Sequence, residues 1–178
     1  MTLEKTIHSL LRDVPDFPKP GILFKDITPL LAEPNIRRQV VVTIGNHYRS
    51  LGVEVVASVE ARGFIFGMLI AQELEVPFVP VRKSGKLPYR KISEEYSLEY
   101  GKASIEMHED AIAPGCKVLV HDDLLATGGT AGATGNLIRR LKGEVMGFSF
   151  IINLAFLPGE QKLTTQFGVK PHYLVSYS

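Results

Sequence analysis

The order of apolar and polar positions predicts strands that alternate with helices. Residues 53–59, 117–121 and 144–154 form nearly continuous apolar runs, as in strands that are buried on both faces. Residues 63–74 and 131–141 instead repeat apolar side chains at helical spacing. The remaining expected elements are helices at 3–11 and 35–51 and strands at 78–82, 103–108 and 173–177. This alternation predicts an α/β fold, with a mainly parallel twisted sheet that is flanked by helices.

Two segments interrupt the alternation. In Asp16–Gly21, two prolines and a glycine follow the first helix and must end it. Residues 83–102 are polar, contain two glycines and a proline, and predict a long loop or a hairpin. Long loops within compact domains usually have a functional role. The length of 178 residues fits one domain that includes both segments.

Composition and charge narrow the range of partners. Twenty basic and nineteen acidic residues give a formal charge of +1, which disfavours non-specific nucleic-acid binding. Cys116 is the single cysteine, so an intrachain disulfide is impossible, as expected for a protein of the reducing cytoplasm. The start of the chain lacks the apolar stretch of a secretory signal, and no apolar run is long enough to span a bilayer. We therefore expect a cytoplasmic protein with no membrane and no nucleic-acid partner.

The segment Val118–Thr130 carries the clearest chemical signal. A buried strand ends at two adjacent acids, Asp122 and Asp123, and a short step leads to a glycine-rich turn and a helix. Ligands of open α/β sheets bind at this carboxyl edge of the strands. The residues expected to surround a terminal phosphate with backbone N–H groups and hydroxyls are Ala126, Thr127, Gly128, Gly129 and Thr130.

The two acids indicate what is attached to that phosphate. Carboxylates repel a phosphate but accept hydrogen bonds from sugar hydroxyls, so Asp122 and Asp123 fit the hydroxyls of a ribose. A phosphate loop beside such acids predicts a site for a sugar phosphate. The alternative is a glycine-rich turn next to a solvated acidic pair, which this order of strand, acids and Thr-Gly-Gly-Thr disfavours.

This stretch resembles the phosphoribosyl pyrophosphate signature of the type I phosphoribosyltransferases. Neither the Gly-x-Gly-x-x-Gly nor the Gly-x-x-x-x-Gly-Lys-Ser/Thr nucleotide motif is present. Three further segments resemble the adenine-specific members of that family: residues 16–29, residues 59–64, and residues 79–88 together with 96–101. The resemblance implies the fold of the family, with residues 1–34 as a base-binding hood and residues 83–102 as a mobile catalytic loop.

The resemblance also implies roles for individual residues. Phe24 would stack on adenine, with contacts from Leu23 and from the backbone or side chain of Lys25, although Phe24 taken alone reads as a core residue. Arg62, in a loop where the family often has a non-proline cis peptide, would bind pyrophosphate together with the basic residues Arg82, Lys83 and Lys86. Taken alone, the cluster of three basic residues indicates a solvent-exposed loop.

The long loop carries the implied proton chemistry. Glu99 would manage a proton on the adenine ring, with Tyr100 beside it, once the loop has closed over the substrates. The implied reaction converts adenine and phosphoribosyl pyrophosphate into AMP and pyrophosphate. Mg²⁺ would be held mainly by substrate phosphates and water, with no metal site built of protein side chains alone. The family is usually homodimeric, and residues of the basic loop reach the neighbour's site.

Four positions depart from the family pattern, and two other functions remain open. Lys25 replaces a frequent arginine, Ser58 a glycine, His121 a branched aliphatic residue, and Asn153 a glutamate. His121 is interpreted as a strand-end residue and not as a catalyst. One alternative is a phosphoribosyltransferase for guanine, hypoxanthine or xanthine. The other is a regulatory protein that binds phosphoribosyl pyrophosphate without turnover.

Overall fold

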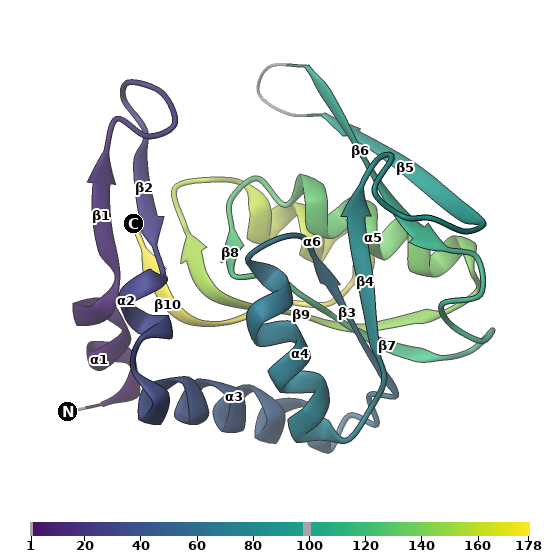
Figure 1. Cartoon of the computed structure of the whole chain (residues 1–178), viewed down its shortest axis with the longest axis horizontal. Coiled ribbons are helices and arrows are strands. Elements are labelled where there is room, and N and C mark those ends of the chain that lie inside the picture. The colour runs from purple at the N-terminus through teal and green to yellow at the C-terminus, as the bar shows by residue number, and fades with distance from the viewer. Residues whose placement is uncertain (1, 98–100) are drawn as a thin grey trace.

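The molecule is built on a mostly parallel sheet of eight strands (Figure 1). The computed structural model describes residues 2–97 and 101–178. The strands follow one another across the sheet in the order β10 (His172–Tyr177), β9 (Glu144–Leu154), β7 (Lys117–His121), β3 (Val55–Val59), β4 (Phe78–Lys83), β6 (Lys102–His108) and β5 (Lys91–Ser97), with β8 (Leu124–Leu125) beside β9. The pairings from β10 to β4 are parallel, whereas β4–β6 and β6–β5 are antiparallel. The predicted fold class is confirmed.

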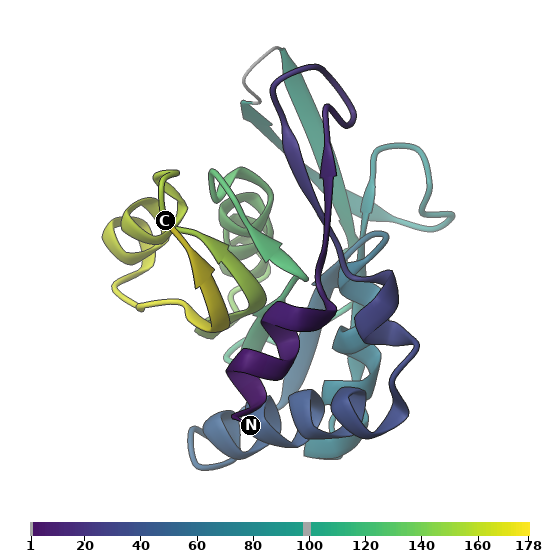
Figure 2. The same ribbon diagram turned by 90° about the vertical axis from the view of Figure 1, so that its left-hand side faces the viewer.

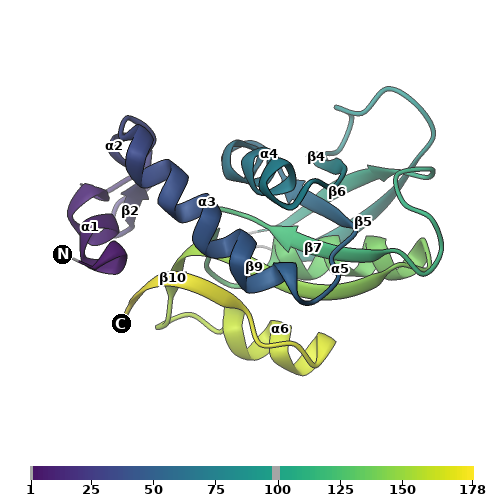
Figure 3. The ribbon, with the colours of Figure 1, turned by 90° about the horizontal axis from the view of Figure 1, so that it is seen from below.

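Helices cover both faces of this sheet (Figure 3). The helices α3 (Pro34–Arg49) and α4 (Gly63–Leu74) pack against one face, where Val56 and Leu119 are fully buried. The helices α5 (Gly129–Arg140) and α6 (Gly159–Phe167) lie on the other face, over Ala57 and Val120. Because successive side chains of a strand point to opposite faces, the apolar runs of β3 and β7 supply both cores.

The N-terminal segment adds a helix and a hairpin beside the sheet, with Ile7 and Ile27 buried in the same core as α3. Helix α1 (Leu3–Leu10) begins at Thr2, whose hydroxyl accepts a hydrogen bond from the backbone of Lys5. A two-stranded antiparallel hairpin, β1 (Arg12–Pro15) and β2 (Leu23–Asp26), follows it and leads through α2 (Thr28–Leu31) to α3. Figure 2 shows this hairpin standing above α1 and α3. The sequence predicted the helix and the break but not the hairpin, which is short.

The segment 83–102 is largely a second hairpin. Strands β5 and β6 pair continuously from Lys91 opposite His108 to Ser97 opposite Lys102, and residues 84–90 connect β4 to β5. A hairpin was one of the two predicted forms. Figure 1 shows the two hairpins rising on the same side of the molecule. In the part of the chain that the structure describes, no helix is both long and apolar enough to cross a membrane.

Candidate active site

Three polar loops meet at the carboxyl edge of the parallel strands. Strands β7, β3 and β4 are neighbours, with His121 paired to Ser58 and Val59 paired to Val81. The segments that follow them, which begin at Asp122, Glu60 and Ser84, therefore leave the sheet side by side. The predicted sugar-phosphate loop and both predicted basic groups lie in these segments or at the end of β4.

The glycine-rich turn forms a small cavity at the start of α5. Residues 122 and 124–131 line it together with Phe150, and its volume is about 80 Å³. Gly128 has the left-handed φ of 72°, so α5 begins at Gly129, two residues earlier than predicted. The first turn of α5 contains no acidic side chain, which leaves its N-terminal N–H groups and the positive end of its dipole available to an anion.

The end of the second hairpin packs against this turn. A Cβ atom on Gly129 would lie 3.1 Å from Cδ2 of Tyr96 and 3.4 Å from the carbonyl oxygen of Ser97. Tyr96 and Ser97 of β5 therefore lie against the glycine-rich turn. Glu99 and Tyr100, to which the family resemblance gave roles, lie outside the described residues.

The acid pair is partly withdrawn from solvent. Asp123 is 3% exposed and Asp122 is half-buried, and Oδ1 of Asp122 accepts a hydrogen bond of 2.9 Å from the backbone N–H of Asp123. Burial, reinforced by the charge of Asp123, raises the pKa of Asp122 well above its ordinary value. Burial also raises the pKa of Asp123, although the charge of Arg62 opposes that rise. Hydroxyl donors from a sugar would stabilise the ionised pair.

Arg62 joins the acid pair to the N-terminal hairpin. Its Nε lies 2.9 Å from Oδ2 of Asp123, and its Nη1 donates a hydrogen bond of 3.3 Å to the carbonyl of Lys25. Its guanidinium also lies 4.7 Å from the centre of the Phe24 ring. The peptide bond between Glu60 and Ala61 in the same loop is cis, as the family resemblance implied.

The candidate base-binding strand exposes an aromatic pair. Phe24 is half-buried, belongs to neither core, and contacts Phe17 edge-to-face at 5.1 Å. Leu23 is 51% exposed beside it. The side chain of Lys25 turns away, since its Nζ lies 2.6 Å from Asp13 and 3.8 Å from the centre of the Tyr177 ring. Only the backbone of Lys25 thus faces Arg62.

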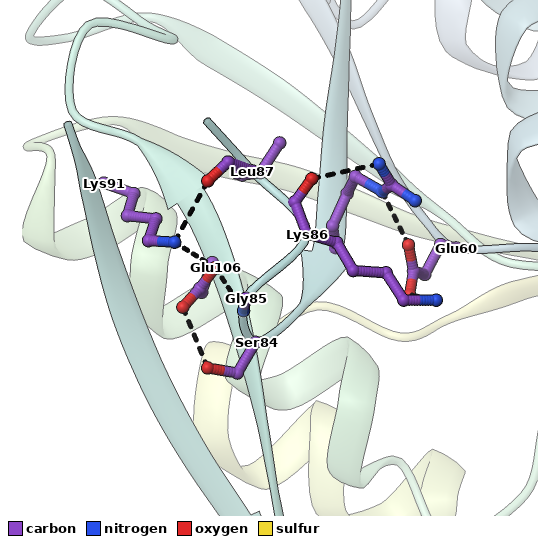
Figure 4. Close-up of polar contacts among 8 residues, drawn as sticks. Glu60, Ser84, Gly85, Lys86, Leu87, Lys91 and Glu106 are labelled. Carbon is purple, nitrogen blue, oxygen red and sulfur yellow. Dashed lines mark hydrogen bonds and ion pairs between the residues drawn. The ribbon is translucent and has the colours of Figure 1, made fainter. Parts of the chain in front are cut away.

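The basic residues at the end of β4 and in the loop after it converge on a buried glutamate that the sequence analysis did not assign. Nε of Arg82 and Nζ of Lys86 lie 2.6 and 3.3 Å from the two carboxylate oxygens of Glu60, whose side chain is 5% exposed (Figure 4). Burial alone would raise the pKa of Glu60, but contacts from Arg82, Lys83 and Lys86 hold it below its ordinary value. Its place inside the motif Glu60-Ala-Arg-Gly63 was the only signal in the sequence.

The three remaining departures from the family pattern lie inside the fold. The hydroxyl of Ser58 donates a hydrogen bond of 2.7 Å to the carbonyl of His121, which ties β3 to β7 just before their loops. Burial lowers the pKa of His121 to about 3, which agrees with a neutral strand-end residue. Asn153 donates a hydrogen bond of 3.2 Å to Ser176 on β10. A Cβ atom on Gly63 would lie 3.1 Å from the Ser58 hydroxyl, so Ser58 also lies next to the end of the Glu60–Gly63 loop.

The donor set fits a cation that arrives with its own ligands. Among residues 2–97 and 101–178, no group of three or more His, Cys, Asp and Glu side chains is placed to enclose a metal ion. Asp122 and Asp123 offer carboxylate oxygens beside the glycine-rich turn. Mg²⁺ favours such sparse protein ligation, completed by substrate phosphates and water.

Comparison with known families and sequences gives one consistent result. Residues 27–163 match the phosphoribosyl transferase domain family. An adenine phosphoribosyltransferase of Cytophaga hutchinsonii is 55% identical over 161 residues, which cover 90% of this chain and 89% of the relative. One from Myxococcus xanthus is also 55% identical, over 91% of this chain and 88% of its own.

Solved structures agree with this assignment. The adenine phosphoribosyltransferase of Rhodothermus marinus superposes with a TM-score of 0.93 at 46% identity and covers 98% of both chains. That of Saccharomyces cerevisiae, in complex with an imino-altritol bisphosphate and adenine, gives 0.89 at 32% identity over 97% of this chain and 98% of its own. That of Trypanosoma brucei, in complex with AMP, pyrophosphate and ribose-5-phosphate, gives 0.89 at 27% identity over 99% and 80%.

Proposed function

Because the chain belongs to the phosphoribosyltransferase family, we propose that it transfers the phosphoribosyl group of phosphoribosyl pyrophosphate to adenine, giving AMP and pyrophosphate. This reaction salvages a free purine base. The observation that carries the proposal is the acid pair beside a phosphate-sized cavity at one sheet edge, in a chain 55% identical to adenine phosphoribosyltransferases. A ribose 5-phosphate needs both features.

The phosphoribosyl group takes the centre of the site. Ala126 to Thr130 bind the 5′-phosphate through backbone N–H groups, hydroxyls and the helix dipole. Asp122 and Asp123 accept hydrogen bonds from the ribose hydroxyls. As the bond to pyrophosphate breaks, positive charge develops on the sugar, and the same carboxylates offset it. Substitution of both by Asn is expected to reduce turnover severely and to leave the fold intact.

Pyrophosphate leaves toward the basic residues. Arg82, Lys83 and Lys86 compensate its charge, and Arg62 connects this side of the site to the sugar. The ion pairs of Glu60 with Arg82 and Lys86 support this assignment, since a buried carboxylate already draws both cations to the sheet edge. Mg²⁺ enters with phosphoribosyl pyrophosphate and neutralises part of its charge.

Adenine binds against the N-terminal hairpin. Its ring stacks on Phe24 beside Leu23, and the backbone of residues 23–25 forms hydrogen bonds with the edge of the base. Glu99 handles the proton on the adenine ring, with Tyr100 beside it, as the family resemblance implies. Closure of the second hairpin keeps water away from the activated sugar. The packing of Tyr96 and Ser97 on Gly129 supports a place for this hairpin beside the sugar-phosphate site.

The enzyme works as a homodimer in the cytoplasm. Ile65 and Met68 on the outer face of α4 are 41% and 53% exposed, which is apolar area for a second copy to cover. The single cysteine suits a reducing compartment. Light scattering is expected to give twice the mass of 19.7 kDa, and Met68→Asp to halve the result. A wild-type monomer would refute the dimer and leave the reaction untouched.

The reaction itself is tested by product stoichiometry. Purified protein, phosphoribosyl pyrophosphate, Mg²⁺ and adenine are expected to yield AMP and pyrophosphate in a ratio of about one to one, resolved by ion-exchange chromatography. The variant with Asn at 122 and 123 serves as the control for background hydrolysis. Binding of phosphoribosyl pyrophosphate without any AMP would refute the transferase and favour a regulatory protein.

A further inference from the structure

Glu106 is a buried acid that the proposed reaction leaves without a role. It lies on β6 and is 4% exposed. Its Oε1 accepts a hydrogen bond of 2.9 Å from the hydroxyl of Ser84, and its Oε2 accepts one of 3.0 Å from the backbone N–H of Gly85. Nζ of Lys91 lies 3.1 Å from the same Oε2 (Figure 4). A buried carboxylate is tolerated when it is paired and hydrogen-bonded in this way.

These contacts hold both ends of the loop that connects β4 to β5. Ser84 and Gly85 begin the loop, Gly85 with a left-handed φ of 83°, and Lys91 follows its end. Lys91 also donates a hydrogen bond of 3.0 Å to the carbonyl of Leu87. Glu106 therefore attaches the loop to β6 through side-chain contacts, directly at its start and through Lys91 in its middle. These contacts add to the backbone hydrogen bonds from Ser84 to Ser104 and from Glu109 to Arg90.

The side chains of Arg82, at the end of β4, and of Lys86, in the loop, extend away from Glu106 and toward Glu60. Nη1 of Arg82 donates a hydrogen bond of 3.1 Å to the carbonyl of Lys86, so the path of the loop also sets Arg82. Both side chains extend to Glu60 at the carboxyl edge of the sheet, as Figure 4 shows for Lys86. Glu106 and Glu60 thus contact the same loop, but only Glu60 lies beside the loops of the site.

We propose that Glu106 is a positioning residue that fixes the loop so that Arg82 and Lys86 meet the pyrophosphate group of the substrate. The proposal rests on the proposed function for the identity of the anion. Glu106 touches neither substrate nor reacting atoms and acts through Ser84, Gly85 and Lys91. Its effect must appear in binding of the diphosphate and not in binding of adenine.

Two substitutions of different severity separate anchoring from folding. In Glu106→Gln, the amide oxygen can accept from Gly85 and Lys91 while the amide N–H donates to the Ser84 hydroxyl, so the contacts persist and only the charge is lost. In Glu106→Ala, all three contacts vanish. The matched control is Glu95→Ala on the same hairpin, because Glu95 forms an exposed pair with Lys102, with side-chain exposures of 68% and 75%.

Calorimetric titration measures the affinity of each variant for inorganic pyrophosphate with Mg²⁺ and, separately, for AMP. Steady-state kinetics then give the KM for each substrate. Glu106→Ala is expected to weaken pyrophosphate binding and to raise the KM for phosphoribosyl pyrophosphate, each by roughly tenfold or more, the loss expected for one to two charge-assisted contacts. AMP affinity and the KM for adenine stay within about twofold. Glu106→Gln shows a smaller change of the same kind, and Glu95→Ala none.

Three outcomes overturn the proposal: unchanged pyrophosphate binding in Glu106→Ala, equal losses for pyrophosphate and AMP, or the same loss in Glu95→Ala. If Glu106→Ala does not fold, Glu106→Gln and Ser84→Ala decide by the same comparison. The pyrophosphate titration needs no turnover. A wild-type protein that binds pyrophosphate but makes no AMP therefore refutes the proposed function separately from the role of Glu106.

Discussion

Asp122→Asn is expected to weaken catalysis and to stabilise the fold at the same time. Asp122 sits beside a second carboxylate, and burial together with the charge of Asp123 raises the pKa of Asp122. The ion pair of Arg62 goes to Asp123 and not to Asp122. Asn is isosteric and keeps an oxygen that can accept the N–H of Asp123. The substitution therefore removes the buried like charge and little else.

The size of both effects follows from these contacts. Removal of this like charge relieves repulsion that solvent contact only partly screens, so we expect Asp122→Asn to add roughly 1–2 kcal/mol to the free energy of unfolding, or about 2–8 °C in Tm. Loss of a charged acceptor for a ribose hydroxyl costs about 1.5–3 kcal/mol, which lowers kcat/KM for phosphoribosyl pyrophosphate roughly 10- to 100-fold.

The pH dependence gives the sharpest check on this reasoning. A carboxyl whose folded pKa is raised stabilises the protein at low pH, and that stability is lost as the pH rises through the folded pKa. The advantage of Asp122→Asn in Tm must therefore grow as the pH rises from 3.8, the ordinary pKa of an aspartate, toward the raised folded pKa. Asp123→Asn is the matched control, because it removes the ion-pair partner of Arg62 and should therefore give no increase in Tm. A Tm for Asp122→Asn at or below that of the wild type, or a gain independent of pH, would refute the argument.

Three further predictions address the phosphate loop, the proton chemistry and acid stability. Gly128→Ala and Gly168→Ala both place Ala at a left-handed φ, so each should lower the free energy of unfolding by about 1 kcal/mol in denaturant titrations. Only Gly128→Ala, whose Cβ also lies 3.1 Å from the Gly159 carbonyl oxygen, should raise the KM for phosphoribosyl pyrophosphate. Equal kinetics in the two variants would contradict the role of the turn. Glu99→Gln should lower kcat more than it weakens adenine binding, and an equal loss of both would reduce Glu99 to a pocket residue. Burial and the charge of His47 lower the pKa of His172 to about 4, so the stability of the protein should fall as the pH drops from about 6.5 toward 4. In thermal melts, His172→Phe should flatten this decline in Tm, and an equal decline in both proteins would refute the role of His172.

Strongly periodic elements could be predicted from the sequence almost residue by residue. Strands β7 and β9 have the predicted bounds because both of their faces are buried in the sheet. Helix α4 has the predicted bounds because its buried residues recur at helical spacing. The hairpin β1–β2 was missed because its strands have only four residues each and carry no clear alternation of apolar and polar side chains. Helix α6 was missed because Leu163 is its one buried large apolar residue among those described.

The candidate site was predictable in composition but not in pairing. The signature residues lie together because one strand, one turn and one helix contain them, and local sequence determines that geometry. The partners of Lys25, Arg62 and Arg82 come from distant segments, namely Asp13 and Tyr177, Asp123, and Glu60. Such pairings depend on the tertiary arrangement, so neither the turned-away side chain of Lys25 nor the roles of Glu60 and Glu106 could be read from residue types.

A competition among purine bases tests the central claim most directly. The protein is incubated with phosphoribosyl pyrophosphate, Mg²⁺ and an equimolar mixture of adenine, hypoxanthine, guanine and xanthine, and the nucleotides are resolved by ion-exchange chromatography. AMP as the dominant product is the predicted result. Dominant IMP, GMP or XMP would keep the sugar-phosphate site but contradict the base pocket at Phe24, and no nucleotide at all would contradict the proposed transfer.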